Sequence, residues 1–297
     1  FSYYFGNELY KIMCEPYTSK IWKIDPSQIS ADWADQRFKV FNLTELINKI
    51  LLKLIRLDFS SYSLDDETLA PDGGEFYYGE KGGAQDIPDA FARVLKANNI
   101  SIITKVLIEK INENSMYVSY RKKGVIRKVR AVEKIISTIP FNDSYNYLNK
   151  RDNIIKSILF DKLKYMDIIF VYLMLDQDAV SNDHWLYFPD REIIFNRSVE
   201  FKNWSKSMCP TYKTAICLDI TCFKGEAIWT QSKDEISRRC IDDATKVGLI
   251  DKKNVFDHFV VKVKNAYPFY DLDYKAKIKT VVQYFEKEKS IACLGRT

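Results

Sequence analysis

The sequence predicts a mixed α/β (α+β) protein in which one α/β domain is interrupted by a domain built on a mostly antiparallel sheet. Three observations predict this class. Apolar runs of strand length lie between longer stretches of helical periodicity. Their order is helices first, then an α/β segment, then long strands joined by short turns, then α/β again. The 297 residues, 46% of them hydrophobic, suffice for more than one core.

Residues 1–75 are predicted to form a helical lid or substrate subdomain. Apolar residues recur at helical spacing between Leu43 and Leu57, and Asn42 or Thr44 can cap that helix. A polar, turn-rich stretch from Ser60 to Gly74 then closes the section.

Residues 76–140 are predicted to be part of an α/β domain. Gly82 and Gly83 open a helix expected at 85–97. Lys122, Lys123 and Gly124 form the tip of a hairpin. The strands expected here are 100–104, 106–111, 116–121, 125–130 and 134–138.

Residues 141–266 are predicted to form the antiparallel sheet domain, and residues 267–297 return to the α/β domain. The helix expected at 232–246 ends before Gly248, and a last helix is expected at 274–287. The strands expected are 166–175, 184–188, 192–196, 214–221, 255–264 and 291–294.

Composition excludes several classes of function. The net charge of +5 is small against 45 basic and 40 acidic residues, so neither nucleic acid nor a membrane surface is expected as a partner. The basic run Arg121-Lys122-Lys123 is interpreted as a solvated hairpin tip. No apolar run approaches the ~18 residues of a membrane span. The composition leaves the oligomeric state open.

The cysteines and the N-terminal residues suggest a compartment. Six cysteines without a CxxC pair and two histidines without ligand spacing indicate buried thiols in a reducing, cytoplasmic setting rather than disulfides or a metal site. The first residues lack a signal peptide and an initiator Met, so we expect the chain to be an internal piece of a longer protein.

The common catalytic motifs are absent. The sequence contains no GxSxG, HExxH, P-loop or GxGxxG. His258 lies in an alternating strand, where a structural role is the expectation, and no catalytic residue is assigned.

Four segments carry information jointly through their order and spacing. They are Tyr17-Thr-Ser-Lys-Ile-Trp22 with Ile29 to Arg37; Lys81-Gly-Gly-Ala-Gln-Asp with Val106 and Ile136-Ser-Thr-Ile-Pro140; Phe195-Asn-Arg197; and Ala266-Tyr267-Pro268 with Gly295-Arg296.

This order resembles the flavoprotein clan that contains protoporphyrinogen oxidases, amine oxidases and UDP-galactopyranose mutases, over roughly residues 7–297. The resemblance implies FAD as cofactor and a FAD/NAD(P)-binding-like domain, incomplete here, that the substrate domain interrupts. It implies contacts to the cofactor from Gly82, Gly83, Val106, Gly295 and Arg296. The glycine-rich unit that holds the FAD pyrophosphate has no match in the sequence, so the sequence leaves open whether this chain binds FAD by itself.

The same resemblance implies a small-molecule substrate held by Tyr17, Trp22, Arg37, Arg197 and Tyr267. In the mutase branch, Tyr17 would face the uracil and Trp22 the sugar, and arginine forks would hold the diphosphate of a nucleotide sugar.

Two departures from the mutases favour the oxidase-like branch. Lys23 follows Trp22 where mutases usually have Gly, and Ser137-Thr-Ile-Pro140 replaces a Gly-Pro turn. Three hypotheses remain: an FAD-dependent oxidoreductase, favoured; a flavin-dependent mutase of UDP-sugars; and a non-catalytic binding module.

Overall fold

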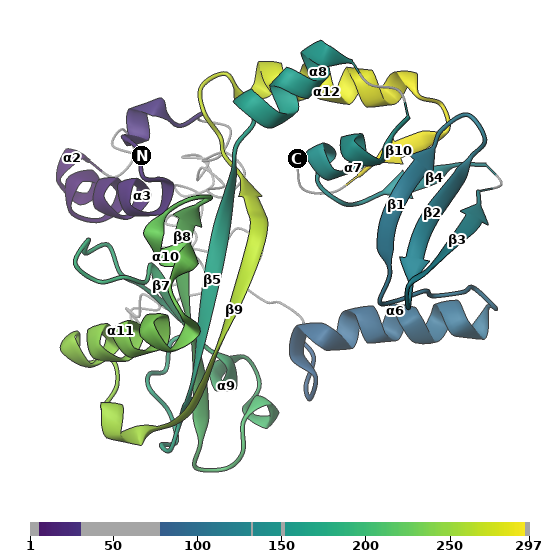
Figure 1. Cartoon of the computed structure of the whole chain (residues 1–297). Coiled ribbons are helices and arrows are strands. Elements are labelled where there is room, and N and C mark those ends of the chain that lie inside the picture. Colours follow the sequence, from purple (N-terminus) through teal and green to yellow (C-terminus); the bar gives the residue numbers. More distant parts are fainter. Residues whose placement is uncertain (1–5, 31–77, 132, 150–151, 295–297) are drawn as a thin grey trace, which may run out of the picture.

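The computed structural model describes residues 6–30, 78–131, 133–149 and 152–294. The helix predicted between Leu43 and Leu57 lies outside the described residues, as do Arg37, Gly295 and Arg296. Two parts are visible in Figure 1, each built around its own sheets, and α12 (Tyr274–Lys287) and α8 (Asn153–Ser157) lie along one end of both.

The five-stranded part holds a mixed-length antiparallel sheet in the order β6-β7-β8-β5-β9. Its strands are β5 (Tyr165–Leu175), β6 (Trp185–Tyr187), β7 (Arg197–Glu200), β8 (Thr214–Phe223) and β9 (Val255–Pro268). Its helices are α2 (Asn7–Leu9), α3 (Glu15–Trp22), α9 (Phe201–Trp204), α10 (Ala227–Thr230) and α11 (Lys233–Lys246). A π-helical turn, Tyr10–Cys14, joins α2 to α3.

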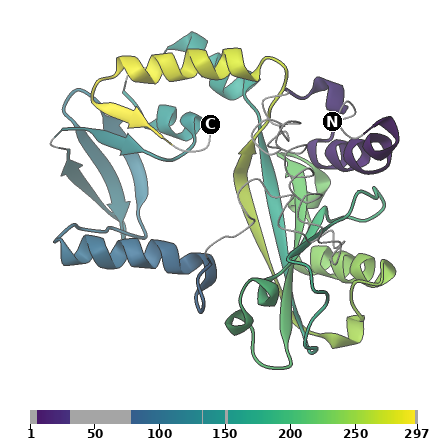
Figure 2. The ribbon, with the colours of Figure 1, turned by 180° about the vertical axis from the view of Figure 1, so that it is seen from behind.

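The small-sheet part holds a three-stranded antiparallel sheet and a two-stranded parallel sheet. Its strands are β1 (Leu107–Asn112), β2 (Tyr117–Lys122), β3 (Val125–Arg130), β4 (Ile135–Ser137) and β10 (Ile291–Cys293). Its helices are α6 (Asp86–Ala97) and α7 (Phe141–Tyr147); α8 continues into a π-helical turn, Ile158–Lys162. Figure 2 shows the two parts from behind, with α12, in yellow, spanning between them.

One core lies between the five-stranded sheet and α11. The sheet residues Leu173 and Leu218 and the helix residues Ile236 and Cys240 are all fully buried. Ser232 caps α11 through a capping box with Glu235. The second core joins α3 to α7, α8 and α12, and Trp22, Tyr145 and Phe285 are buried in it.

Most predicted elements are confirmed within a residue or two, including α12 at 274–287 and the Lys123-Gly124 hairpin tip, where both residues have positive φ. The expected strand 192–196 is wrong. Ile193 and Phe195 are buried at alternate positions of a loop, not of a strand, and β7 begins only at Arg197. The expected strand 100–104 is also wrong, because no described segment pairs with it.

Candidate functional site

The five-stranded sheet leaves one face free of α11, and aromatic side chains line it. Residues directly opposite one another on neighbouring strands share a face. One row contains Tyr187, Arg197, Asp219 and Phe170. The next row contains Trp185, Val199, Cys217, Tyr172 and Phe259. We call this surface the aromatic face; Trp185, Tyr187 and Phe259 on it are 41%, 53% and 46% exposed.

Three rings stack side by side at the centre of the aromatic face. The ring centroid of Tyr172 lies 4.4 Å from that of Phe259, with an angle of 11° between the ring planes. It lies 5.8 Å from the ring centroid of Phe201, with an angle of 10°. Burial, together with the neighbouring Cys217, raises the pKa of Tyr172 to about 12. The stack therefore offers an uncharged, largely apolar surface to a ligand.

A fixed cation lies at one end of the aromatic face. Arg197 Nε donates to Asp219 Oδ2 at 2.8 Å, and its Nη2 bonds the same oxygen. Burial alone would lower the pKa of Arg197, but Asp219 reverses this and raises it. Burial raises the pKa of Asp219, and Arg197 only partly offsets that effect. Asp219 is 6% exposed, so the carboxylate acts as an internal anchor that orients the guanidinium.

Tyr17 reaches this end from α3. Its ring lies 5.0 Å from the ring of Tyr187 in an edge-on contact at 75°. Both phenols are close enough to Arg197 to act on its pKa. The structure therefore brings together Tyr17 and Arg197, two of the predicted substrate residues, and adds Tyr187.

The glycine-rich loop before α6 contacts the opposite end of the aromatic face. Tyr78 lies 5.3 Å from Trp204, whose ring stacks on Trp185 at 5.4 Å. The carbonyl of Glu80 accepts a hydrogen bond of 2.6 Å from Ser205 Oγ. Thus the loop predicted to face a flavin is attached to the part of the chain that carries the aromatic face.

Gly83 is required in that loop for two reasons. Its φ of +59° is in the left-handed region, and a Cβ there would lie 2.9 Å from the side chain of Met208 and from the Tyr78 hydroxyl. Gly82 N donates to Asp86 Oδ2 at 3.2 Å, so an acidic side chain already occupies the start of α6. That helix N-terminus therefore does not suit a phosphate.

Three further predicted residues that the structure describes lie away from the aromatic face. Trp22 is 2% exposed and its ring centroid lies 5.7 and 6.0 Å from those of Phe269 and Tyr270, so it lies in the core rather than on that face. Tyr267 is half-buried on β9 opposite Met166, and packs against that same core. Val106 is half-buried just before β1.

Sequence reasoning missed Asp219, Tyr172, Tyr187 and Trp204. Asp219 was detectable as a lone acid inside the apolar run of β8, since such residues are buried only when paired. The aromatic residues need the strand register, which places residues from five separate strands in common rows.

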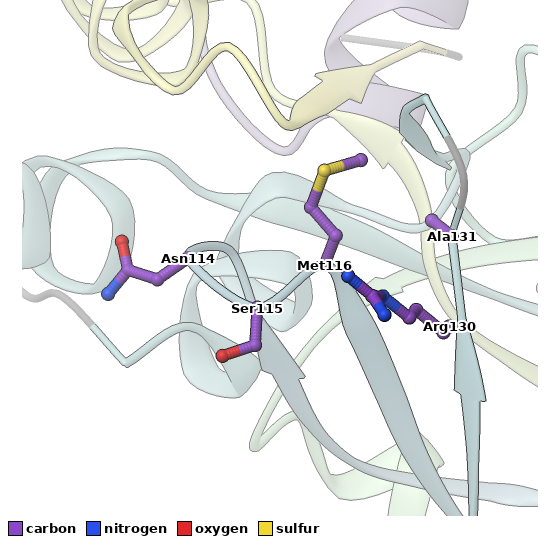
Figure 3. A pocket seen from close by; sticks show the side chains of 5 residues that line it. All are labelled: Asn114, Ser115, Met116, Arg130 and Ala131. Carbon is purple, nitrogen blue, oxygen red and sulfur yellow. The ribbon is translucent and has the colours of Figure 1, made fainter.

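A hollow of about 370 Å³ lies elsewhere, at the turn between β1 and β2 and the end of β3 (Figure 3). Its lining residues are Asn114, Ser115, Met116, Arg130 and Ala131. It contains none of the predicted site residues. None of the helices in the described ranges has the length and apolar character needed to span a membrane.

No family model and no curated protein sequence matches this chain. Solved structures do match its fold. Reduced UDP-galactopyranose mutase aligns with a TM-score of 0.74 and 18% identity over 98% of this chain and 59% of its own. A putative protoporphyrinogen oxidase from Exiguobacterium sp. 255-15 aligns with a TM-score of 0.67 and 14% identity, over 99% of this chain and 61% of its own.

Cyclohexylamine oxidase from Brevibacterium oxydans IH-35A gives a TM-score of 0.57 and 10% identity, over 95% of this chain and 57% of its own. The chain thus spans about three fifths of the length of the structures it resembles. The predicted resemblance to the protoporphyrinogen oxidase, amine oxidase and UDP-galactopyranose mutase clan is confirmed at the level of the fold.

Proposed function

We propose that this chain forms the substrate-binding part of an FAD-dependent oxidoreductase of the amine-oxidase or protoporphyrinogen-oxidase type. One observation carries the proposal, namely the exposed aromatic face and what lies at its two ends. Arg197, Tyr17 and Tyr187 lie at one end, and the glycine-rich loop contacts Trp204 at the other. A small, largely flat substrate would lie along this face. The fold shared with an amine oxidase and a putative protoporphyrinogen oxidase supports it.

Bound FAD would supply the chemistry by accepting hydride at its ring. The described residues fit the substrate side of such a site better than the cofactor side. Asp86 occupies the N-terminus of α6, and Gly82 packs against that carboxylate. The described part of the chain therefore offers no turn that suits the FAD pyrophosphate, and contacts from Gly82, Gly83, Val106, Gly295 and Arg296 remain predictions.

The mutase alternative is weaker. It assigns Trp22 specifically to a sugar, whereas Trp22 is packed in the core; the oxidoreductase hypothesis also placed Trp22 in the pocket, but it keeps the aromatic face without that contact. Its remaining support is the fold shared with reduced UDP-galactopyranose mutase and the proximity of Tyr17 to Arg197. The contacts proposed for Arg37 and Tyr267 belong to both enzyme hypotheses.

We also propose a cytoplasmic location, in keeping with the reducing setting indicated by composition. All six cysteines are free thiols. Burial raises the pKa values of Cys217, Cys222 and Cys240, which keeps them protonated and unreactive at neutral pH.

The test is the visible absorbance spectrum of the protein isolated from its own cells. We expect a flavin spectrum that dithionite bleaches. Addition of cyclohexylamine or protoporphyrinogen, without oxygen, should bleach it as well if the protein is an oxidoreductase. Conversion of UDP-galactopyranose only after reduction would instead identify a mutase. A protein that stays colourless when FAD is added would leave only the binding module.

A further inference from the structure

Lys20 is a buried cation on α3 that the proposed substrate contacts do not use. It is 7% exposed, and its Nζ donates to the carbonyl of Phe188 at 2.7 Å and to that of Phe195 at 2.6 Å. A lysine is rarely buried to this degree unless polar groups satisfy it. Here two backbone carbonyls from one loop do so.

The loop that Lys20 holds connects β6 to β7, and α11 fixes its other side. Ile194 N donates to Asp243 Oδ2 at 2.7 Å, and Lys246 Nζ bonds Glu192 Oε2 at 2.8 Å. Phe195 is fully buried in the core under α11. The loop is therefore a rigid support, and Lys20 attaches α3 to it.

The two carbonyls are adjacent in sequence to the site. Phe188 directly follows Tyr187, and Phe195 precedes Arg197 by two residues. Tyr17 lies three residues before Lys20, which places both side chains on the same side of α3. One ammonium group thus links the helix that carries Tyr17 to both strand ends that carry its partners.

We propose that Lys20 is a positioning residue that holds Tyr17 against Tyr187 beside Arg197. Its importance for a substrate rests on the proposed function; its effect on Tyr17 does not. Thr221 Oγ1 donates to the Ile21 carbonyl at 3.1 Å, so α3 has one further attachment to the sheet and should remain folded when Lys20 is replaced.

The charges that face Lys20 come from each neighbouring element. Asp190 lies in the loop, Asp243 on α11 and Lys23 at the end of α3. Burial lowers the pKa of Lys20 to about 8 despite the two carboxylates. Since a neutral amine still has two N–H donors, both protonation states can satisfy the two carbonyls.

The first experiment uses fluorotyrosine-labelled full chain and fluorine NMR. Tyr17→Phe and Tyr187→Phe assign the two signals. Lys20→Met should shift both, because it removes the two hydrogen bonds. Lys262→Met is the matched control: Lys262 Nζ also donates to two carbonyls, those of Trp229 and Gln231, at 2.7 and 2.9 Å. It should leave both signals in place.

Unchanged Tyr17 and Tyr187 signals in Lys20→Met would overturn the proposal, as would equal shifts in Lys262→Met. If Lys20→Met does not fold, Lys20→Gln retains one amide donor group and should give smaller shifts in the same direction; no shift in that variant would equally overturn it.

The second experiment separates Lys20 from the proposed function. Binding of cyclohexylamine, protoporphyrin IX and UDP-galactose is measured for the unaltered full chain and for each variant. Lys20→Met should lower the affinity for the probe that binds by roughly tenfold, about 1.4 kcal/mol. In a protein that already carries Tyr17→Ala, the same substitution should cause no further loss of affinity. Additive losses would contradict a role through Tyr17. If no probe binds but the NMR signals shift as expected, the result counts against the proposed function and leaves the positioning role of Lys20 intact.

Discussion

The two parts of the molecule bury their apolar residues to very different degrees. In the five-stranded part, Leu173 and Leu218 are fully buried beneath α11. In the small-sheet part, α6 has no buried residue, and Ile87 and Phe91 are 61% and 67% exposed. Ile136, in the two-stranded parallel sheet, is 63% exposed. Parallel sheets are normally covered on both faces, so this part depends more on further contacts than the other.

The comparison bears on function. The aromatic face is built on the part that supplies its own core, so the proposed substrate contacts rest on a rigid support. The loop with Gly82 and Gly83 begins the part with exposed apolar residues. Because Tyr78 and Glu80 of that loop contact Trp204 and Ser205, we expect substrate binding to be separable from cofactor binding only at the Tyr187 end of the aromatic face.

The largest predicted effect contrasts one residue from each part. Leu173→Ala should lower the free energy of unfolding by about 3 kcal/mol, because it opens a cavity in a closed core. Phe91→Ala should change it by less than about 0.5 kcal/mol, because that ring is already in solvent. Urea denaturation measures both. Equal losses would show that α6 packs as tightly as the five-stranded sheet.

A smaller effect is expected at the anchor of the aromatic face. Asp219→Asn keeps the shape of the side chain but removes the charge that pairs with Arg197. We expect a loss of roughly 2 kcal/mol in unfolding free energy, because the guanidinium keeps only a neutral acceptor. Lys246→Gln, which breaks the exposed pair with Glu192, is the control and should have little effect. An unchanged stability for Asp219→Asn would show that the pair does not anchor the sheet.

The smallest predicted effect, taken per pH unit, is the contribution of Lys20 to the slope of stability with pH. The pKa of Lys20 falls from 10.5 to about 8 on folding, so between these values the unfolded chain binds more protons than the folded one. The contribution of Lys20 to stability should therefore rise with pH across this window, by at most about 1.4 kcal/mol per pH unit. Buried cysteines such as Cys217 and Cys240, whose pKa values are raised, contribute a slope of the opposite sign in the same window, so the effect of Lys20 is measured as a difference between proteins. In thermal unfolding at several pH values, Lys20→Met should show a smaller rise or a steeper fall of stability with pH than the unaltered protein, and Lys262→Met should not. Identical slopes in the unaltered protein and Lys20→Met would contradict the burial of Lys20.

Local sequence patterns predicted the elements that carry their own signals. Ser232 and Glu235 mark the start of α11, and Lys123-Gly124 marks the hairpin. Alternation misled at Ile193 and Phe195, because a loop fixed between two helices can alternate as a strand does. The segment 100–104 has strand composition, but a strand also needs a neighbour.

The candidate site was predictable only in part. Tyr17 and Arg197 followed from the resemblance, and the structure places them together, while their roles stay predictions. Trp22 is buried in the core, since an aromatic residue at the end of a helix serves a core as readily as a ligand, and its contact with a substrate stays a prediction. Asp219 was detectable as the lone acid in the apolar run of β8, whereas Tyr172 became visible only once the register set five strands side by side.

The central claim, that the aromatic face binds the substrate, is tested most directly by the rate at which an amine or protoporphyrinogen reduces the flavin of the native protein without oxygen. Replacement of Tyr187 by Ala, at the exposed end of this face, should weaken substrate binding by roughly tenfold while the flavin spectrum stays unchanged. Tyr212→Ala, at a still more exposed tyrosine in the turn before β8, should behave as the unaltered protein. Equal rates and affinities in all three proteins would contradict the claim.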